Sequence, residues 1–210
     1  MSDKFTMSVG QAHELEMAFS RNGYTNADVK TLSSGDMLGR VLGVIRGMTD
    51  ILPRKFPTWR SVTIGIHGSV ATLKQALVDS GVKVSDYASQ ILKKVKVSKV
   101  ATDLELIVLS VAELGFANGA TFAQIIERAK KLGLDLCPAE VGPALGLVYK
   151  DQPRSEWLLI AMEPITGSVG GSDVFSVGRY GDGLWLDTYW FDSARVWGPG
   201  CRWVFVGPRK

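Results

Sequence analysis

The side chains best suited to recognition chemistry lie in the last thirty residues of the chain, where four of its six tryptophans occur: Trp185, Trp190, Trp197 and Trp203. Large rigid indoles fix a backbone when they are buried. Positions 187–202 otherwise hold small, charged and aromatic residues with no shared hydropathy. Tyr and Arg form binding hot spots, and Ser, Thr and Asp supply adaptable hydrogen bonds. The pattern predicts a fixed scaffold that carries an interchangeable binding surface.

Candidates for catalysis are few. The two histidines are His13, which precedes Glu14 without the second histidine of a zinc-protease motif, and His67 at the end of a predicted strand. The two cysteines, Cys137 and Cys201, fall far short of a disulfide-stapled secreted domain, so free thiols are expected. No phosphate-binding glycine loop, Ser-His-Asp set or calcium loop is apparent in the sequence. We therefore predict a protein that is not an enzyme and has no metal or cofactor.

The composition is that of an ordinary soluble domain, with 210 residues, 46% hydrophobic and a net charge of +3. Lys93, Lys94, Lys96 and Lys99 alternate with valines, which favours a solvated linker or edge strand. The stretch from Met1 to Ser8 lacks the pattern of a secretory signal, and no apolar run is long enough to span a bilayer. Cytoplasmic residence is expected, with surface display by another route left open.

The elements that must position these residues fall into two predicted parts. Residues 1–100 are expected to form a mainly helical N-terminal module with one strand near 59–66, where apolar residues alternate after two prolines. Apolar residues recur at helical spacing over 9–19 and 37–45, where helices are expected. Further short helices are expected from 26, over 72–78 and over 85–92, the last with Ser85 suited to cap it.

Residues 101–210 are predicted to be α+β. A buried strand over 104–111 precedes an amphipathic helix over 121–132 and a short helix from Pro138 to Leu145. Strand-like segments separated by glycine-rich turns then follow at 157–162, 174–177, 183–186 and 203–206. The predicted order is strand, two helices, then antiparallel strands.

Three short sequence motifs accompany this order of strands and helices: Asp151-Gln152-Pro153 with the run 157–164, Gly183-Leu184-Trp185-Leu186, and the terminal run 202–206. On these residues the chain resembles the variable proteins of bacterial diversity-generating retroelements, whose C-terminal half has a C-type-lectin-like fold. The similarity extends through most of the chain, including 111–116 and 136–143. In such systems an error-prone reverse transcriptase randomises adenines, so that AAY asparagine codons become hypervariable. The resemblance implies a ligand-binding display protein whose final segment is edited in the DNA.

The genetic code allows a check on this resemblance. Changes at the first two adenines of an AAY codon cannot produce Lys, Glu, Gln, Met or Trp. Between Asp187 and Arg202, every residue except Trp190 and Trp197 belongs to the set that such changes can produce. The segment is therefore compatible with adenine-directed diversification.

The resemblance also implies roles for individual residues. Trp185, Trp190, Trp197, Trp203 and Phe205 are expected to form the fixed, buried scaffold. The ligand is unknown, with a protein or another macromolecule expected rather than nucleic acid. Phe191 and Arg202 are further candidates beside the expected diversified contacts, which are Asp187, Thr188, Tyr189, Asp192, Ser193, Ala194, Arg195, Val196, Gly198, Gly200 and Cys201.

Two alternative functions stay open. A nucleic-acid-binding adaptor would use the segment from Lys93 to Lys99 and show steeply salt-dependent binding. The C-type-lectin fold is also shared with formylglycine-generating enzymes, which use paired cysteines, so an enzyme of that group would depend on Cys137. Cys201 lies in the segment expected to vary, where a catalytic thiol would not be kept.

Overall fold

The computed structural model describes residues 6–34, 38, 41–42, 56–167, 171–181 and 183–208. The chain divides into a first unit of residues 1–53 and a second of residues 54–210. The helix expected over 37–45 lies largely outside the described residues. The division at 53 to 54 differs from the boundary expected near residue 100, which falls inside the second unit.

The first unit contains the helices α1 (Val9–Arg21) and α2 (Asn26–Leu32), where apolar spacing predicts them. Each begins at a capping box, in which Ser8 pairs with Gln11 and Thr25 pairs with Asp28. Neither helix has a buried residue. The described part of this unit therefore shows capped helices and a ring contact between Phe19 and Tyr24, with centroids 5.1 Å apart, but no buried helical residue.

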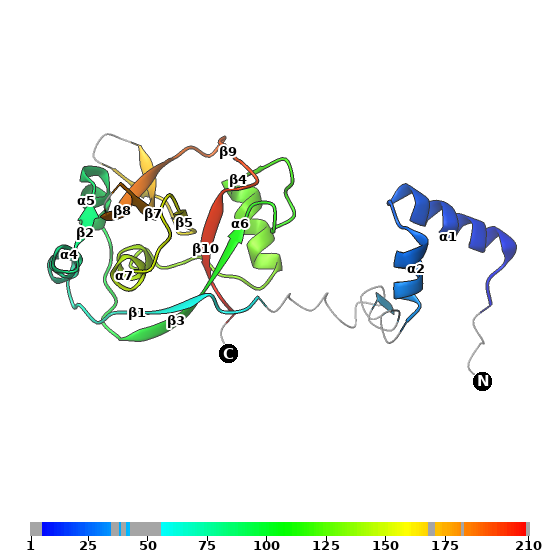
Figure 1. The fold of residues 1–210 in the computed structure, drawn as a ribbon, viewed down its shortest axis with the longest axis horizontal. Coiled ribbons are helices and arrows are strands. Elements are labelled where there is room, and N and C mark those ends of the chain that lie inside the picture. Colours follow the sequence, from blue (N-terminus) through cyan, green and yellow to red (C-terminus); the bar gives the residue numbers. More distant parts are fainter. Residues whose placement is uncertain are drawn as a thin grey trace. The chain divides into compact units, whose positions relative to one another are not determined.

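The second unit is organised around a mixed sheet in the order β1-β3-β10-β5-β7-β8-β2, with β6 paired to β7 (Figure 1). A small separate sheet pairs β4 with β9. The bounds of the strands are β1 Arg60–Ile64, β2 Val82–Val84, β3 Thr102–Ser110, β4 Ala120–Thr121, β5 Trp157–Ile160, β6 Ile165–Thr166, β7 Ser172–Tyr180, β8 Gly183–Phe191, β9 Val196–Trp197 and β10 Arg202–Val206.

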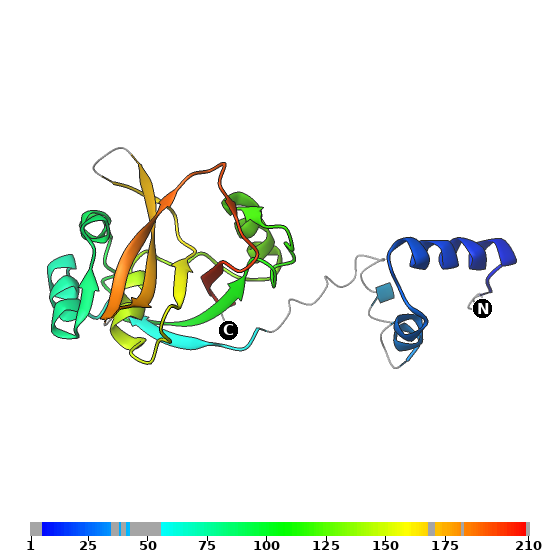
Figure 2. The same cartoon turned by 45° about the horizontal axis from the view of Figure 1, so that its top comes forward.

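The pairing of the strands is only partly antiparallel, which corrects the expected arrangement. β10 runs parallel to β5, and β2 runs parallel to β8. Parallel neighbours require a long crossover connection, and no local sequence pattern announces one. The hairpin of β7 and β8 is antiparallel as expected and runs the full length of both strands (Figure 2).

The helices of this unit are α4 (Val70–Asp79), α5 (Asp86–Leu92), α6 (Phe122–Lys131) and α7 (Val141–Val148). α7 contacts β1 at one edge of the sheet and also the neighbouring strands β7 and β8 toward the other edge, so the sheet curls around it (Figure 1). Most of α7 is buried, and a Cβ on Gly142 would lie 2.7 Å from the Cβ of Phe175. The glycine thus lets the helix approach the sheet closely.

Two early strands explain why the division of the chain differs from the expected one. β1 pairs with β3, and β2 pairs with the start of β8, so both belong to the same sheet as the C-terminal strands. An isolated short strand is not stable without partners, and the sequence identifies strands more readily than their partners. The overall mixture of helices and strands agrees with the α+β prediction, with six helices and a large curled sheet among the described residues.

The lysines at 93, 94, 96 and 99 are exposed and follow α5 without forming a strand. Val95 among them is buried. The Nζ of Lys94 donates a hydrogen bond to the carbonyl oxygen of Thr166 at 2.6 Å. The segment is a connecting loop, which agrees with the linker rather than the edge strand of the sequence interpretation.

Candidate functional site

Two indoles of the C-terminal segment, those of Trp197 and Trp203, are buried, and we call these two residues the pillars of the segment. Trp197 on β9 is 2% exposed and Trp203 on β10 is fully buried, and their rings meet edge to face with centroids 4.8 Å apart. Phe205 is also fully buried. The short connection from 198 to 202 is therefore held at both ends by aromatic packing, as the scaffold hypothesis expected.

Trp190 does not belong to this buried scaffold, which corrects the prediction. Its side chain is 57% exposed near the end of β8. Trp185 is half-buried and stacks on Tyr180, with ring centroids 4.8 Å apart. Whether a strand residue is buried depends on which other elements pack over it, and the hydropathy of the residue does not specify those elements.

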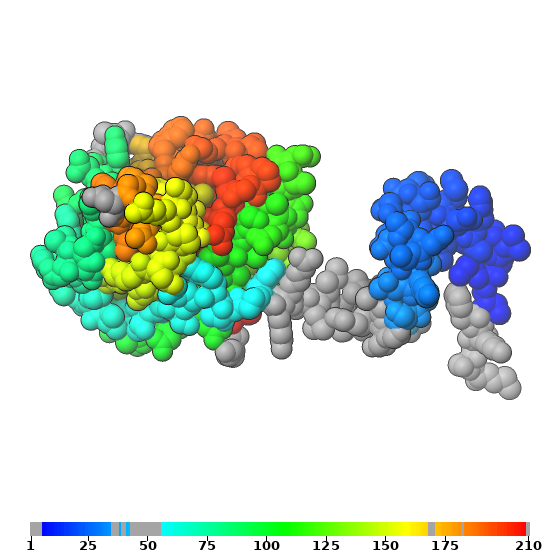
Figure 3. All heavy atoms as spheres, viewed as in Figure 1, coloured from blue at the N-terminus to red at the C-terminus, as the bar shows by residue number. Residues whose placement is uncertain are grey.

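The candidate contact residues lie at the surface of the second unit, and none of them is buried (Figure 3). Several are only half-buried, together with the further candidates Phe191 and Arg202: Asp187, Thr188, Tyr189, Asp192, Arg195 and Cys201. The exposed ones follow the end of β8: Ser193, Ala194, Val196, Gly198 and Gly200.

Gly198 and Gly200 have room for larger side chains. A Cβ built on either glycine meets no atom within 4 Å, and neither backbone adopts the left-handed conformation that favours glycine. Gly178 on β7 is the opposite case, because a Cβ there would lie 2.1 Å from the Cε3 of Trp157. The two glycines of the candidate segment are thus not required by the fold.

The segment borders a surface hollow of about 480 Å³. One side is lined by the connection after β9, including Gly198, Gly200 and Cys201. Tyr189 of β8 and the pillar Trp197 also contribute to it. The opposite side comes from the start of β5 and the turn before it: Ser155, Glu156, Trp157 and Leu159.

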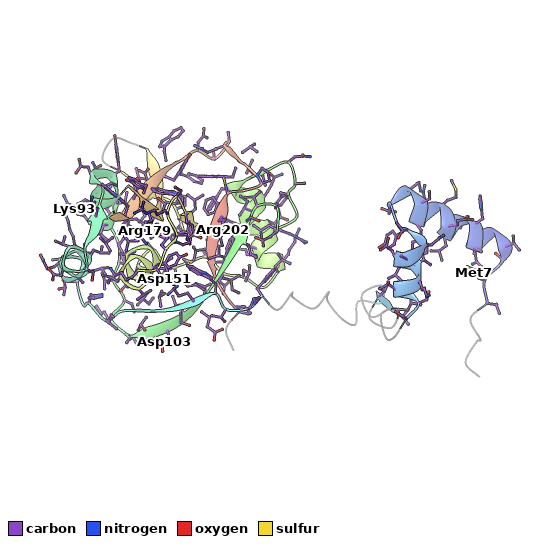
Figure 4. The ribbon with its side chains drawn as sticks, viewed as in Figure 1. Met7, Lys93, Asp103, Asp151, Arg179 and Arg202 are labelled. Atoms are coloured by element: carbon purple, nitrogen blue, oxygen red, sulfur yellow. The ribbon has the colours of Figure 1, made fainter. Side chains whose placement is uncertain are left out.

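The carboxylate of Glu156, which lines this hollow, accepts two hydrogen bonds from neighbouring side chains. The Nη1 of Arg202 donates to Glu156 Oε1 at 2.5 Å, and the Tyr149 hydroxyl donates to Glu156 Oε2 at 2.5 Å. Arg202 reaches this position from β10 (Figure 4). Burial, followed by the hydrogen bond to Glu156, raises the pKa of Tyr149 well above its usual range. Glu156 carries no sequence signal, since a lone glutamate before a strand is common on protein surfaces.

Tyr189, Arg195 and Trp197 form a compact group beside the hollow. The Cζ of Arg195 lies 4.5 Å from the ring centroid of Tyr189 and 4.7 Å from that of Trp197. The Nη2 of Arg195 also donates to the Tyr189 hydroxyl at 2.7 Å. The two rings meet edge to face with their centroids 5.0 Å apart, and the guanidinium lies in the corner that they form. Sequence reasoning selected these side chains separately but not their association.

Asp187 has a structural contact as well as partial exposure. The hydroxyl of Ser85, which is the N-cap of α5, donates to its Oδ1 at 2.6 Å. The nearby Asp173 on β7 is nearly buried, and burial raises the pKa of its carboxyl. Substitution of Asp187 would therefore disturb the contact between α5 and β8. In this respect Asp187 differs from the exposed candidate residues.

A row of aromatic side chains that the sequence analysis did not single out continues from the hollow. Trp157, Gly178 and Trp185 occupy paired positions across β5, β7 and β8 and therefore share one face of the sheet. The ring of Tyr180 lies 5.6 Å from that of Trp157, and the Nζ of Lys83 on β2 lies 5.4 Å from the ring of Trp185. The three rings lie on three different strands, β5, β7 and β8, so no local pattern in the sequence reveals the row.

The catalytic candidates are scattered. His13 lies on α1 with its Nδ1 3.7 Å from Glu16, and the half-buried His67 follows β1. Both cysteines are free thiols. Cys137 is buried, donates to the carbonyl oxygen of Val204 at 3.3 Å, and has its thiol pKa raised by that burial. Reactive cysteines need an accessible thiolate, so this environment does not favour a nucleophile.

Within the ranges that the structure describes, no three His, Cys, Asp or Glu side chains gather in a way that could hold a metal ion. No described helix has the length and apolar character to cross a membrane.

Comparison with known proteins produced no match to a family model, to a curated protein or to a solved structure. What the site can do must therefore be inferred from its own geometry.

Proposed function

We propose that the protein is a ligand-binding display protein that presents its C-terminal surface for diversification, on a domain of C-type-lectin-like type. The resemblance to variable proteins of diversity-generating retroelements supplies this idea. The observation that carries it is structural: Trp197 and Trp203 are buried, whereas none of the candidate positions is, and Gly198 and Gly200 between the two tryptophans are exposed and have room for larger side chains. The proposed function includes no catalysis and no cofactor.

Physical reasoning supports such an arrangement. Substitutions at exposed positions away from caps and tight contacts usually change stability by no more than about 0.5 kcal/mol. Several exposed slots can therefore vary together without unfolding a domain of ordinary stability. The buried pillars hold the backbone of the segment, so that new side chains appear in a constant frame.

The contacts also rank the proposed variable positions. Asp187 is bonded to the cap of α5, and Tyr189 packs against Trp197, so changes at these two sites affect the scaffold. We place the freely variable contacts first at Ser193, Ala194, Val196, Gly198 and Gly200, all of which are exposed.

The hollow then has a varying side and a constant side. Gly198 and Gly200 line it from the segment proposed to vary, whereas Glu156 and Trp157 line it from β5 and the turn before it. Larger side chains at the two glycines would extend over the hollow and change its shape. A single frame could thus present many different binding surfaces, each completed by the same ion pair between Glu156 and Arg202.

The test compares two small libraries encoded with NNY codons and displayed on cells. Resistance to protease reports the folded fraction of each library. We expect most members of the exposed library to stay folded and most members of the buried library to unfold, because only the latter create cavities or bury polar groups. The exposed library varies Val196, Gly198 and Gly200, and the buried library varies the β-strand valines Val174, Val177 and Val204.

A second step selects the exposed library against a panel of unrelated proteins. Recovery of specific binders whose affinity is lost on reversion of the selected positions would support the proposal. Equal loss of folding in the two libraries would contradict it. The genomic test is a near-copy of the terminal coding segment with adenines at the proposed slots, beside a reverse-transcriptase gene, and absence of both would remove the diversification part.

A further inference from the structure

The geometry of Tyr189 and Trp197 points to a cation-binding site that the chain's own Arg195 fills. We propose that this aromatic corner, defined by the rings of Tyr189 and Trp197, binds guanidinium or alkylammonium groups of a ligand when Arg195 is withdrawn or replaced. The inference names a ligand chemistry for the surface, and it rests on the proposed function only in taking that surface as the recognition face.

Arg195 already shows what the corner holds. Its guanidinium carbon lies within 5 Å of both ring centroids, at 4.5 Å from Tyr189 and 4.7 Å from Trp197. The Tyr189 hydroxyl accepts a hydrogen bond from its Nη2 at 2.7 Å. The negative faces of two aromatic rings together with a hydroxyl oxygen are the features that attract an organic cation.

Both rings of the corner are held in place by the fold. Trp197 is 2% exposed and packs on Trp203, so one wall of the corner is part of the core. Tyr189 lies on β8, paired with Val174 of β7, so the second wall is fixed by the sheet. A corner with two rigid walls retains its shape when the side chain between them changes.

Arg195, which occupies the corner, is less constrained than the two rings that form it. Arg195 is half-buried in a turn where its backbone N–H donates to the carbonyl oxygen of Asp192 at 3.1 Å. It also belongs to the positions proposed to vary, whereas Trp197 cannot arise from the proposed codon changes. Many variants would therefore keep the indole wall and lose the cation.

The corner shares both of its rings with a hollow large enough for the body of a ligand. Tyr189 and Trp197 line both the corner and the hollow of about 480 Å³. A partner protein could place a lysine or arginine head group in the corner and its neighbouring residues in the hollow. The ligand class is therefore a cationic side chain or a quaternary ammonium group, not an anion.

The experiment uses the full chain and titrates Arg195→Ala with tetramethylammonium chloride at constant ionic strength, following the NMR signal of the Trp197 indole N–H. We expect saturable binding that is at least about tenfold tighter than to the unchanged protein. Arg195→Met is the matched control, because it fills the corner without a charge and should bind no better than the unchanged protein. tert-Butanol, a neutral molecule of similar shape, should bind Arg195→Ala at least about tenfold more weakly than the cation does.

Three results would overturn the inference: no saturable binding to Arg195→Ala, equal binding to Arg195→Met, or equal binding of tert-butanol. If Arg195→Ala does not fold, the test is a double-mutant cycle of Arg195→Met and Tyr189→Leu, in which the folding equilibrium constant of each variant is measured. A coupling of about two- to fivefold in the folding equilibrium constant supports a cation site, and additive effects reject it. The library test does not vary residue 195, so failure here and failure of the proposed function are distinguishable.

Discussion

Gly178 and Gly198 are predicted to respond differently to substitution by alanine. In Gly178→Ala, the new Cβ would lie 2.1 Å from Cε3 and 2.4 Å from Cζ3 of Trp157. Carbon atoms are best separated by about 3.5–4.0 Å, so the indole must move by roughly 1.5 Å. That movement is resisted by the ring of Tyr180, whose centroid is 5.6 Å away. The substitution should therefore cost about 1–3 kcal/mol through overpacking.

Gly198→Ala is the matched control. Its Cβ meets nothing within 4 Å, and its backbone suits any residue. The substitution reduces the freedom of the unfolded chain without strain, so it should leave stability unchanged or raise it by up to about 1 kcal/mol. Gly200→Ala should behave in the same way, for the same reasons.

Urea unfolding followed by far-UV circular dichroism measures the three variants. With a slope of about 2 kcal/mol per molar urea, the midpoint for Gly178→Ala should fall by about 0.5–1.5 M. The midpoints for the other two variants should stay at or slightly above that of the unchanged protein. A midpoint for Gly178→Ala equal to that of the unchanged protein would refute the packing argument, and an equal fall in Gly198→Ala would refute the claim that the segment has room to vary.

Three further predictions concern aromatic and thiol groups. Trp190→Ala should change the free energy of unfolding by about 1 kcal/mol or less, because the Trp190 side chain is 57% exposed. Trp197→Ala should lower the free energy of unfolding by about 3–5 kcal/mol, because Trp197 is buried. Equal losses for the two variants in guanidinium unfolding would contradict the assignment of Trp197 to the buried scaffold. Burial, with a neighbouring carboxylate, raises the pKa of Tyr149 above the ordinary 10.0, so its stabilising effect is present below that pH and is lost as pH rises beyond it. Urea unfolding at increasing alkaline pH should show a smaller decline for Tyr149→Phe than for the unchanged protein. Cys201 should react with a thiol reagent at least about tenfold faster than the buried Cys137 in the native protein, and both should react alike once it is unfolded.

Local elements were predictable where capping and periodicity coincide. Ser85 is the N-cap of α5, as the sequence predicted, and α6 (Phe122–Lys131) lies within the helix expected over 121–132. β3 and β10 were identified from continuous apolar runs. β2 was missed because its three residues, Val82–Val84, are too short to form a pattern between two helices.

The candidate site was less predictable because its parts meet through the sheet. Residue type alone selected Tyr189 and Arg195 as contacts, but their joint position against Trp197 depends on the turn after β8. The pairing of Glu156 with Arg202 joins residues 46 positions apart in the chain. The exposure of Trp190 likewise follows from its place near the end of a strand, which hydropathy does not encode.

The two outermost strands of the large sheet, β1 and β2, both come from the first hundred residues. A truncated fragment that starts at residue 101 would lack them and leave the long strands β3 and β8 with open rows of amide and carbonyl groups. Such rows recruit other chains, so we expect that fragment to aggregate. Any shortened version made for selection experiments should therefore retain the polypeptide from before Arg60 onward.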